Sequence, residues 1–199
     1  MSADARASWP PRELIDSFLG NFPHEFEIRP GETVEVDSEE EQARARTFRD
    51  VLGRYCSGVT VVTTVSDGAP VGMTCQSFTS VSLDPPLVAF LPTKQSRAFA
   101  AIKRSGHFCV NFLAAGQQDI SNAMASRAVE DKFAGVGWSR SVSGSALLDG
   151  VVGHVDCTVH DIHEAGDHYI VIGKVVDLAV GGDVDPLLYF RGAYRSTNN

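Results

Sequence analysis

Residues 72–96 read GMTCQSFTSVSLDPPLVAFLPTKQS, and this stretch is the best guide to both fold and function. It has the pattern of two buried β-strands that meet at Asp84-Pro85-Pro86. The first strand is crowded with hydroxyl and amide side chains, namely Thr74, Gln76, Ser77, Thr79, Ser80 and Ser82. A buried hydroxyl without a hydrogen-bond partner costs about 1–3 kcal/mol. A polar, planar ligand would supply such partners, so we expect a binding site along this strand.

The flanking sequence predicts more strands than helices. Runs rich in β-branched residues indicate strands at Val59–Val65, Val71–Leu83, Leu87–Leu91, His107–Leu113, Val151–Val159, His168–Asp177 and Leu187–Tyr194. Asp67-Gly68 predicts a hairpin turn, and a second turn is expected at Glu164–Asp167. Short strands at this spacing, interrupted by a few helices, favour a mainly β fold: a closed antiparallel barrel with helical insertions.

Helix signals occur at several places. Ser38 and Glu41 have capping-box spacing and open a helix to about Tyr55, with Phe48, Val51, Leu52 and Tyr55 as its expected buried face. A short helix Arg97–Lys103 is expected after the capping residue Ser96, with its end at Gly106. Helices are also expected at about Pro10–Leu19 and Gln117–Ser126, whereas Asn21–Asp37 is expected as an extended arm and Asp131–Trp138 as a loop.

Charge divides the chain into two parts. The net charge is −8, and residues 1–40 contain ten acidic residues against three arginines, so the remainder is almost neutral. We therefore expect an acidic N-terminal extension, residues 1–40, followed by one domain, residues 41–199. A partner-docking arm is the alternative to a merely solvated extension. Nucleic acid is disfavoured as a partner because phosphate contacts need clustered Lys and Arg.

Other features narrow the class of protein. No apolar run approaches the ~20 residues that cross a bilayer, and the N-terminus lacks the pattern of a secretory signal, so a membrane location is not expected. The scattered cysteines, Cys56, Cys75, Cys109 and Cys157, favour reduced thiols in a cytoplasmic protein. Sequence motifs for a Rossmann dinucleotide site, a phosphate loop or a nucleophile elbow are absent. Hydrolase and kinase functions are therefore disfavoured.

One histidine-rich segment has metal-like spacing, namely His154, Cys157, His160, His163 and His168. On a strand, however, odd and even positions face opposite sides, which separates His154 and His160 from Cys157 and His163. No metal site is expected. His168 differs because it follows a tight turn and opens a strong strand, where its ring could enter a cleft; an exposed strand-end histidine is the simpler alternative.

Lys94, Ser96 and Arg97 stand at the start of the short helix. A helix N-terminus with an added cation suits a phosphate, although helix capping by Ser96 beside a solvated lysine explains the pattern equally simply. Together, the hydroxyl-rich strand and this cationic helix start suit a ligand with a polar ring at one end and a phosphate at the other. Flavin mononucleotide or the proximal half of FAD has this shape.

Several spaced motifs carry a resemblance to a known family. The stretch from GVTVVTT through PVGMTCQSFTSVSLDPPLVAF, followed by FCVNFL, DKFAGV, GDHYIVIGKV and PLLYFRGAY, resembles the flavin reductase family over about Thr47–Arg195. The resemblance implies a split-barrel flavin-binding fold and a homodimer. It also implies the role of reductase component in a two-component flavin-dependent monooxygenase.

The resemblance further implies positions for the ligands. Thr74, Cys75, Gln76 and Ser77 would lie along the isoalloxazine ring of FMN or FAD. The ribityl chain and phosphate would follow Ser80, Val81 and Ser82. Residues bordering the phosphate or adenylate side would be Lys94, Ser96, Phe108, Cys109 and Asn111. His168 would face the nicotinamide, as the one residue with an expected catalytic role, and Tyr194 would line the same cleft.

The implied reaction is hydride transfer from C4 of NADH, or of NADPH, to N5 of the flavin. This chemistry needs two stacked rings with reacting atoms ~3–3.5 Å apart and no metal or strong nucleophile, in keeping with the missing catalytic motifs. His168 would orient the nicotinamide amide or assist protonation of the reduced flavin. The alternatives are a flavin-binding carrier or sensor without turnover and an oxidase of the pyridoxamine-phosphate type. The latter would need more basic residues near the phosphate than Lys94 and Arg97.

Overall fold

The structure, a computed structural model, describes residues 39–197. All of them belong to the unit that spans Val36–Asn199. The expected helix at Pro10–Leu19, the extended arm at Asn21–Asp37 and the capping residue Ser38 lie outside the described residues.

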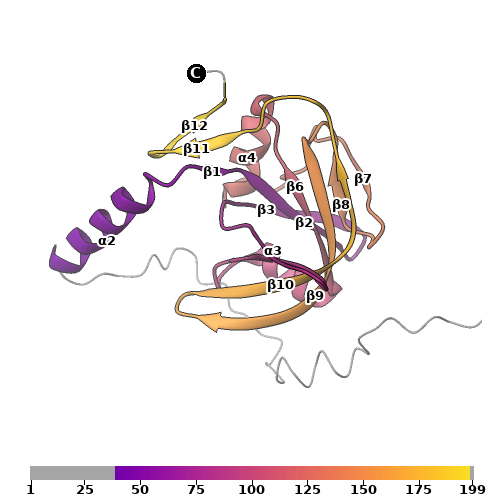
Figure 1. The fold of residues 1–199 in the computed structure, drawn as a ribbon, viewed down its shortest axis with the longest axis horizontal. Coiled ribbons are helices and arrows are strands. Elements are labelled where there is room, and N and C mark those ends of the chain that lie inside the picture. The colour runs from indigo at the N-terminus through magenta and orange to yellow at the C-terminus, as the bar shows by residue number, and fades with distance from the viewer. Residues whose placement is uncertain (1–38, 198–199) are drawn as a thin grey trace, which may run out of the picture. The chain divides into compact units, whose positions relative to one another are not determined.

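Seven antiparallel strands make the main sheet (Figure 1): β2 (Thr60–Ser66), β3 (Ala69–Cys75), β4 (Thr79–Leu83), β5 (Pro86–Phe90), β6 (His107–Phe112), β9 (Gly153–Ala165) and β10 (His168–Val180). Their order across the sheet is β3-β2-β6-β9-β10-β5-β4. The two edge strands, β3 and β4, are consecutive in the chain and are joined only by residues 76–78. A flat sheet of this order would be about 29 Å wide at ~4.8 Å per strand, whereas this link reaches roughly 14 Å. The sheet therefore curls until its edges approach, which makes a barrel with a seam between β3 and β4.

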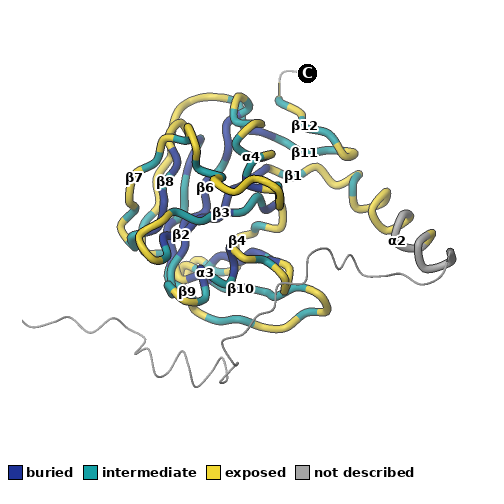
Figure 2. Tube along the Cα trace, turned by 180° about the vertical axis from the view of Figure 1, so that it is seen from behind, coloured by how far each residue is buried: buried dark blue, intermediate teal, exposed yellow. Residues whose placement is uncertain are grey.

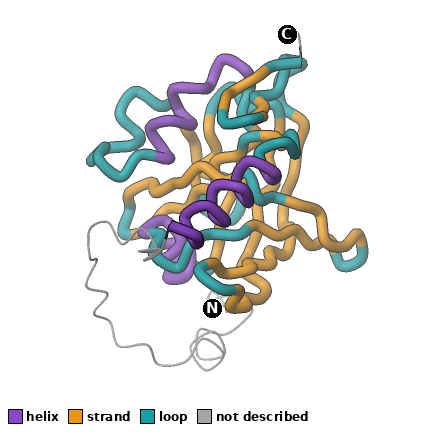
Figure 3. Tube along the Cα trace, turned by 90° about the vertical axis from the view of Figure 1, so that its left-hand side faces the viewer, coloured by secondary structure: helices purple, strands orange, loops and turns teal. Residues whose placement is uncertain are grey.

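The remaining strands form two small sheets, and helices lie beside the barrel (Figure 3). Strands β1 (Ser57–Gly58), β11 (Leu188–Phe190) and β12 (Ala193–Arg195) form one small sheet, and β7 (Trp138–Arg140) pairs with β8 (Ala146–Leu148) in the other. The helices are α2 (Glu39–Leu52), α3 (Arg97–Ser105) and α4 (Gln118–Ala125), with a short 3₁₀ turn, η1, at Ala115–Gln117. Helix α3 packs on β2, β3 and β6, and α4 packs on β3 and β2. The expected barrel with helical insertions is confirmed.

Two apolar clusters hold the fold together, one on each face of β2. Val62 of β2 belongs to the cluster that also contains Phe90, Phe108 and Ile102, whereas Val61 packs with Met124 of α4. Burial on both faces explains why β2 consists of Val and Thr up to its last residue, Ser66, with the hydroxyls of Thr60 and Thr63 bonded to main-chain carbonyls. Figure 2 shows this burial in dark blue along β2, in contrast to the exposed surface of α2.

The local signals at both ends of α3 and at the first hairpin are confirmed. Ser96 caps α3 by accepting a hydrogen bond from the N–H of Phe99, and Gly106 ends it at φ 74°. Asp67 and Gly68, at φ 53° and 81°, form the two-residue turn between β2 and β3. A tight hairpin turn in which both central residues have positive φ favours an Asp-Gly pair.

Two of the expected strands are divided in the structure. Val71–Leu83 becomes β3 and β4, because β3 pairs with β2 while β4 pairs with β5 at the opposite end of the strand order. Leu187–Tyr194 becomes the β11–β12 hairpin, with Arg191 and Gly192 in its turn at φ 51° and 75°. Strands β9 and β10 in turn run past the expected ends Val159 and Asp177, and β1, β7 and β8 are too short to give a sequence pattern.

The expected burial on the first described helix is wrong. Phe48, Val51, Leu52 and Tyr55 are 66%, 60%, 54% and 80% exposed. The helix also ends at Leu52, three residues before the expected end. The periodicity correctly identified one apolar helix face, but no part of residues 39–197 covers that face.

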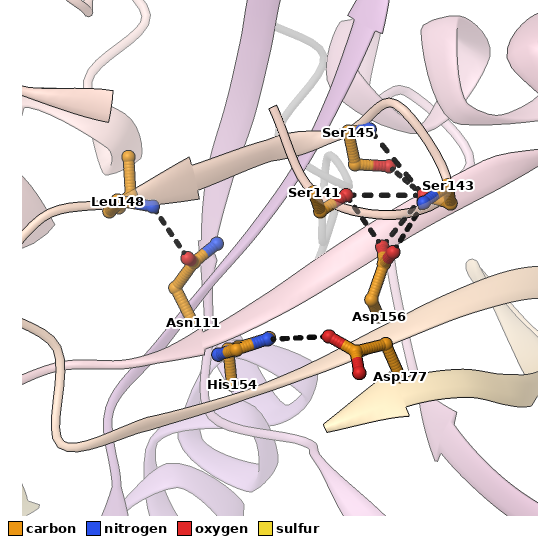
Figure 4. Close-up of polar contacts among 8 residues, drawn as sticks. All are labelled: Asn111, Ser141, Ser143, Ser145, Leu148, His154, Asp156 and Asp177. Carbon is orange, nitrogen blue, oxygen red and sulfur yellow. Dashed lines mark hydrogen bonds and ion pairs between the residues drawn. The ribbon is translucent and has the colours of Figure 1, made fainter. Parts of the chain in front are cut away.

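A buried carboxylate attaches the β7–β8 hairpin to β9 (Figure 4). Asp156 is fully buried, and its Oδ1 accepts hydrogen bonds from the hydroxyls of Ser141 (2.9 Å) and Ser143 (2.6 Å). Its Oδ2 accepts the main-chain N–H of Ser143 at 2.6 Å. Ser143 in turn contacts Ser145 at 2.9 Å, and Ser145 contacts His107 Nδ1 at 2.7 Å. The carboxylate is thus satisfied by donors from the hairpin loop.

Candidate functional site

Strand β4 provides a polar edge to the barrel seam. Among the described strands it pairs only with β5, so one of its edges is open. Val81 is the extra residue of a bulge between Ser80 and Ser82, and it is 49% exposed. Main-chain N–H and C=O groups on an open edge bind flat ligands that carry both donors and acceptors. The hydroxyl-rich strand therefore lies at the surface of the seam, not in the core.

The break between β3 and β4 is fixed by one hydroxyl. Ser77 Oγ donates to the carbonyl of Leu91 (3.2 Å) and accepts from its N–H (3.1 Å). The thiol of Cys75, only 7% exposed, lies 3.2 Å from the same hydroxyl. Gln76 between them is exposed. These contacts fix residues 75–77 at the point where β3 ends and the chain leaves the barrel wall.

Thr74 and Tyr194 are connected through α4. Thr74 Oγ1 donates to the carbonyl of Ser121 at 2.5 Å, and the buried hydroxyl of Ser121 lies 2.9 Å from the phenol oxygen of Tyr194. Tyr194 also donates to Asn122 Oδ1 at 2.9 Å. Within residues 39–197, these hydrogen bonds place Tyr194 with the end of β3 and not with the His168 turn. Ser121 and Asn122 had no distinguishing signal in the sequence.

Ser96 and Lys94 lie at the start of α3. The hydroxyl of Ser96, besides capping the helix, is 3.1 Å from Met73 Sδ of β3, which places the helix start beside the seam. Lys94 Nζ binds Glu164 Oε2 at 2.8 Å and lies 5.6 Å from the centre of the Tyr169 ring. The hydrogen bond to Glu164 raises the pKa of Lys94 and lowers that of Glu164. In this arrangement Lys94 neutralises a carboxylate of the β9–β10 hairpin, which leaves less of its charge for a phosphate.

Other cations lie close to the same helix start. Arg97 Nη2 donates to the carbonyl of Arg127 at 3.3 Å, and Lys132 Nζ donates to the carbonyl of Met124 at 2.6 Å. Partial burial, followed by the nearby charge of Arg97, lowers the pKa of Lys132. Lys132 was not among the expected site residues, although it belongs to the DKFAGV motif that carried the resemblance.

His168 begins β10 at the tip of the β9–β10 hairpin. The turn before it contains Gly166 at φ 61°, and His168 Nδ1 lies 2.7 Å from Asp167 Oδ1. His168 pairs with Thr93 in an isolated bridge, and the carbonyl of Asp167 accepts the N–H of Lys94 at 2.9 Å. The structure thus brings His168 next to the loop that leads into α3.

Phe108, Cys109 and Asn111 are separated from the other expected site residues. All three are fully buried on β6. Phe108 packs edge-on against Phe90 at 4.9 Å, and burial raises the pKa of the Cys109 thiol. The side chain of Asn111 bonds inside the core, where Nδ2 donates to the carbonyl of Val61 and Oδ1 accepts the N–H of Leu148 (Figure 4). These side chains are enclosed in the core of the single chain, and their expected position beside the phosphate stays a prediction.

Two of the three histidines of β9 form pairs with carboxylates. His154 Nε2 is 3.3 Å from Asp177, and His163 Nε2 is 3.0 Å from Asp161. In the part of the chain that the structure describes, no three metal-ligating side chains gather. None of the helices described there has the length and apolar character needed to span a membrane.

A barrel with a polar seam beside a cationic helix start defines the class as split-barrel, flavin-reductase-like. The family model for the flavin reductase like domain matches residues 52–198, and the chain belongs to this family.

Named relatives agree with the family assignment. The chain is 51% identical over 149 residues to the flavin-dependent monooxygenase reductase subunit HsaB of Rhodococcus jostii, a match that covers 75% of this chain and 76% of that protein. It is 49% identical over 148 residues to a flavin reductase of Pseudomonas putida, with 74% and 86% covered.

Solved structures show the same fold. Nitrilotriacetate monooxygenase component B from Mycobacterium thermoresistibile has a TM-score of 0.76 at 52% identity, covering 78% of this chain and 88% of that one. The NADH:FAD oxidoreductase SgcE6 of Streptomyces globisporus, in complex with NAD and FAD fragments, has a TM-score of 0.72 at 37% identity, covering 77% and 92%. The expected split-barrel fold is confirmed.

Proposed function

We propose that this protein is an NADH-dependent flavin reductase that transfers hydride from C4 of the nicotinamide to N5 of FMN or FAD and supplies the reduced flavin to a separate monooxygenase. The observation that carries the proposal is the seam. There the open, hydroxyl-bearing edge of β4 follows Ser77, which bonds to Leu91, while Ser96 at the capped helix start contacts Met73 and the N–H of Lys94 bonds to the His168 turn at Asp167. The relatives named above are flavin reductases and reductase components, which supports the same reaction.

The residues present fit a flavin. The pyrimidine side of an isoalloxazine ring needs both donors and acceptors, and residues 76–82 offer exposed hydroxyls and an unpaired strand edge. Ser96, Arg97 and Lys132 fit the phosphate end, because a helix N-terminus with adjacent cations favours an anion. The flavin supplies the hydride acceptor of the reaction.

The protein's own task is positioning. We assign the ring to Thr74, Cys75, Gln76 and Ser77, the chain beyond it to Ser80, Val81 and Ser82, and the nicotinamide to His168. In this role His168 orients the nicotinamide amide or assists protonation of the reduced flavin. Tyr194 supports the ring side of the site through Ser121, since its hydroxyl is bonded to α4.

The decisive experiment follows NADH absorbance with catalytic protein and excess FMN or FAD. Many turnovers per protein are expected. A single bleaching of bound flavin, or no oxidation at all, would instead identify a carrier or sensor. Parallel assays with FMN and FAD, and with NADH and NADPH, give the preferred pair.

His168→Ala should lower the rate of NADH oxidation while flavin affinity stays nearly unchanged. Equal loss of flavin binding, or a parental rate, would remove His168 from the proposed role.

We also propose that the protein is a homodimer. Phe48, Val51 and Leu52 lie on one face of α2 and, like Tyr55 beyond the end of the helix, are more than half exposed in the single chain, and Leu83 on β4 is 92% exposed. Large apolar side chains gathered on one exposed face mark an interface, and a second copy is the partner that the family resemblance implies.

Light scattering coupled to gel filtration should give twice the chain mass. Phe48→Glu combined with Leu52→Glu should give the single mass, whereas Arg49→Ser on the same helix should not; a monomeric parent contradicts the proposal.

The proposed location is the cytoplasm. Cys75, Cys109 and Cys157 are buried, and they and the exposed Cys56 are free thiols. Burial raises the pKa of Cys157 to about 12, so this thiol stays protonated and unreactive. Free thiols are typical of proteins kept in a reducing compartment. Cell fractionation against a compartment marker tests the location.

A further inference from the structure

His168 and Asp167 form the tightest His–carboxylate contact that the structure describes. Their Nδ1–Oδ1 distance is 2.7 Å, against 3.0 Å for His163–Asp161 and 3.3 Å for His154–Asp177. The ring atom also differs. The other two pairs use Nε2, the nitrogen farther from the backbone, whereas His168 uses Nδ1. Only the His168 pair therefore keeps its outer nitrogen, Nε2, for a ligand.

The chemistry of the carboxylate determines which nitrogen carries the proton. The hydrogen bond from His168, then the charge of the ring, lowers the pKa of Asp167, and Lys94 contributes to the same shift. Asp167 is therefore ionised at neutral pH, and an ionised carboxylate only accepts hydrogen bonds. Nδ1 must then be the donor. In the neutral ring Nε2 is left without a proton and acts as an acceptor.

Main-chain contacts hold Asp167 in place although its side chain is 71% exposed. Its carbonyl accepts the N–H of Lys94 at 2.9 Å, and the N–H of Tyr169 donates to the carbonyl of Pro92 at 2.9 Å. The Lys94–Glu164 ion pair adds a third link between the hairpin and the loop before α3. The backbone that carries the pair is thus attached on both sides of Asp167.

We propose that Asp167 is a positioning residue: its carboxylate accepts the Nδ1–H of His168 and leaves Nε2 as an acceptor for the carboxamide N–H of a nicotinamide dinucleotide. This inference rests on the proposed function of His168. It selects orientation of the nicotinamide over proton donation as the role of His168 in the neutral ring. Asp167 itself need not touch either ligand.

The first arm of the test is spectroscopic and needs no activity. Nitrogen-15 NMR of histidine-labelled protein at a pH where the ring is neutral reports which nitrogen carries the proton, and the His168 signals are assigned by their loss in His168→Gln. The parent should show a protonated Nδ1 and a bare Nε2. Asp167→Ala should give a mixture of both tautomers or the Nε2–H form, and Asp167→Asn, whose amide oxygen still accepts, should restore the parental form. An unchanged spectrum in Asp167→Ala overturns the inference.

The second arm is kinetic. Asp167→Ala should raise KM for NADH by about 3- to 10-fold, the range that one hydrogen bond contributes, with a smaller change in kcat and none in KM for flavin. Asp167→Asn should recover most of this loss. The matched control is Asp161→Ala on the same hairpin, which removes the partner of His163 and should leave KM for NADH at the parental value. Equal increases in KM for NADH in the Asp161 and Asp167 variants would show that any change to the hairpin weakens NADH binding, whatever the tautomer of His168.

The two arms separate this inference from the proposed function. If His168→Ala keeps the parental rate and KM, the nicotinamide role of His168 fails. The NMR arm then still shows whether Asp167 sets the tautomer. If His168→Ala is impaired but Asp167→Ala keeps the parental KM, the proposed function stands and the positioning role is refuted.

Discussion

Replacement of the buried Asp156 tests how firmly the β7–β8 hairpin is attached to the barrel. The carboxylate is fully buried and accepts three hydrogen bonds, two from hydroxyls and one from the main-chain N–H of Ser143. In Asp156→Ala the hydroxyls of Ser141 and Ser143 can turn toward each other, since their oxygens are already 3.3 Å apart. The main-chain N–H of Ser143 has no such freedom and loses its acceptor.

The expected loss of stability follows from these contacts. One unsatisfied buried N–H costs about 1–3 kcal/mol, and hydrogen bonds to a charged group contribute roughly 1.5–3 kcal/mol each. The burial of the charge itself offsets part of this sum, because desolvation of the carboxylate is no longer needed. We therefore expect Asp156→Ala to lower the free energy of unfolding by about 3 kcal/mol, equivalent to a Tm roughly 6–12 °C lower for a chain of this size.

Urea unfolding followed by tryptophan fluorescence, to which Trp138 at the start of β7 contributes, and by circular dichroism measures the effect. The matched control is Asp177→Ala, which removes a carboxylate that is 42% exposed and paired with His154. It should cost less than about 1 kcal/mol. A loss below ~1 kcal/mol in Asp156→Ala would refute the reasoning, since it would mean that the hairpin loop supplies no net stabilisation through this carboxylate.

Three further predictions concern packing, pH and capping. Gly173→Ala places a methyl group against the ring of Phe108 in the barrel core. The free energy of unfolding, measured by thermal unfolding, should fall by about 1–3 kcal/mol. A Tm equal to the parent's would contradict the packing. Burial lowers the pKa of His107 from its usual 6.5, so the unfolded chain binds this proton first and stability should fall as pH drops below 6.5, by at most ~1.4 kcal/mol per pH unit. His107→Gln should flatten that part of the stability curve, and an unchanged curve would exclude His107 as its source. Ser96→Ala should cost about 1 kcal/mol through loss of the α3 cap and Ser96→Thr less, and equal unfolding midpoints for the two variants would contradict the capping role.

The sequence predicted most elements whose signals are local. The turn at Asp67-Gly68, the cap at Ser96 and the end at Gly106 are each set by backbone conformations that neighbouring residues favour. The division of Val71–Leu83 could not be found in this way. Both halves have strand composition, and the break arises from pairing with different partners and from the contact of Ser77 with Leu91, 14 positions away.

The candidate site shows the same difference between local signals and long-range contacts. Residues 74–82 and His168 stand out as candidates because hydroxyls in a strand and a histidine after a tight turn are unusual locally. The burial of Asn111 could not be predicted, because a fully buried amide and a ligand-binding amide look identical in a sequence and its partners, Val61 and Leu148, are far away in the chain. The exposed face of α2 is the opposite case, since periodicity reveals an apolar face but not what covers it.

The seam explains why fold and site coincide in this protein. The first and last strands of the barrel, β3 and β4, are joined by only three residues, yet β3 pairs with β2, β4 pairs with β5, and the described strands form no ladder between β3 and β4. Unpaired edges need polar partners, and the chain places two serines, a threonine and a strand bulge on β4. On the buried strand β2, by contrast, the hydroxyls of Thr60 and Thr63 donate to main-chain carbonyls inside the fold. In the link between β3 and β4, the hydroxyl of Ser77 forms hydrogen bonds with both the carbonyl and the N–H of Leu91. The edge of β4 has no such partner strand among residues 39–197, and a flat ligand with donors and acceptors along one side complements it. The hydroxyls of β4 therefore suit a strand that ends a barrel with one open edge, which is where we propose that the flavin binds.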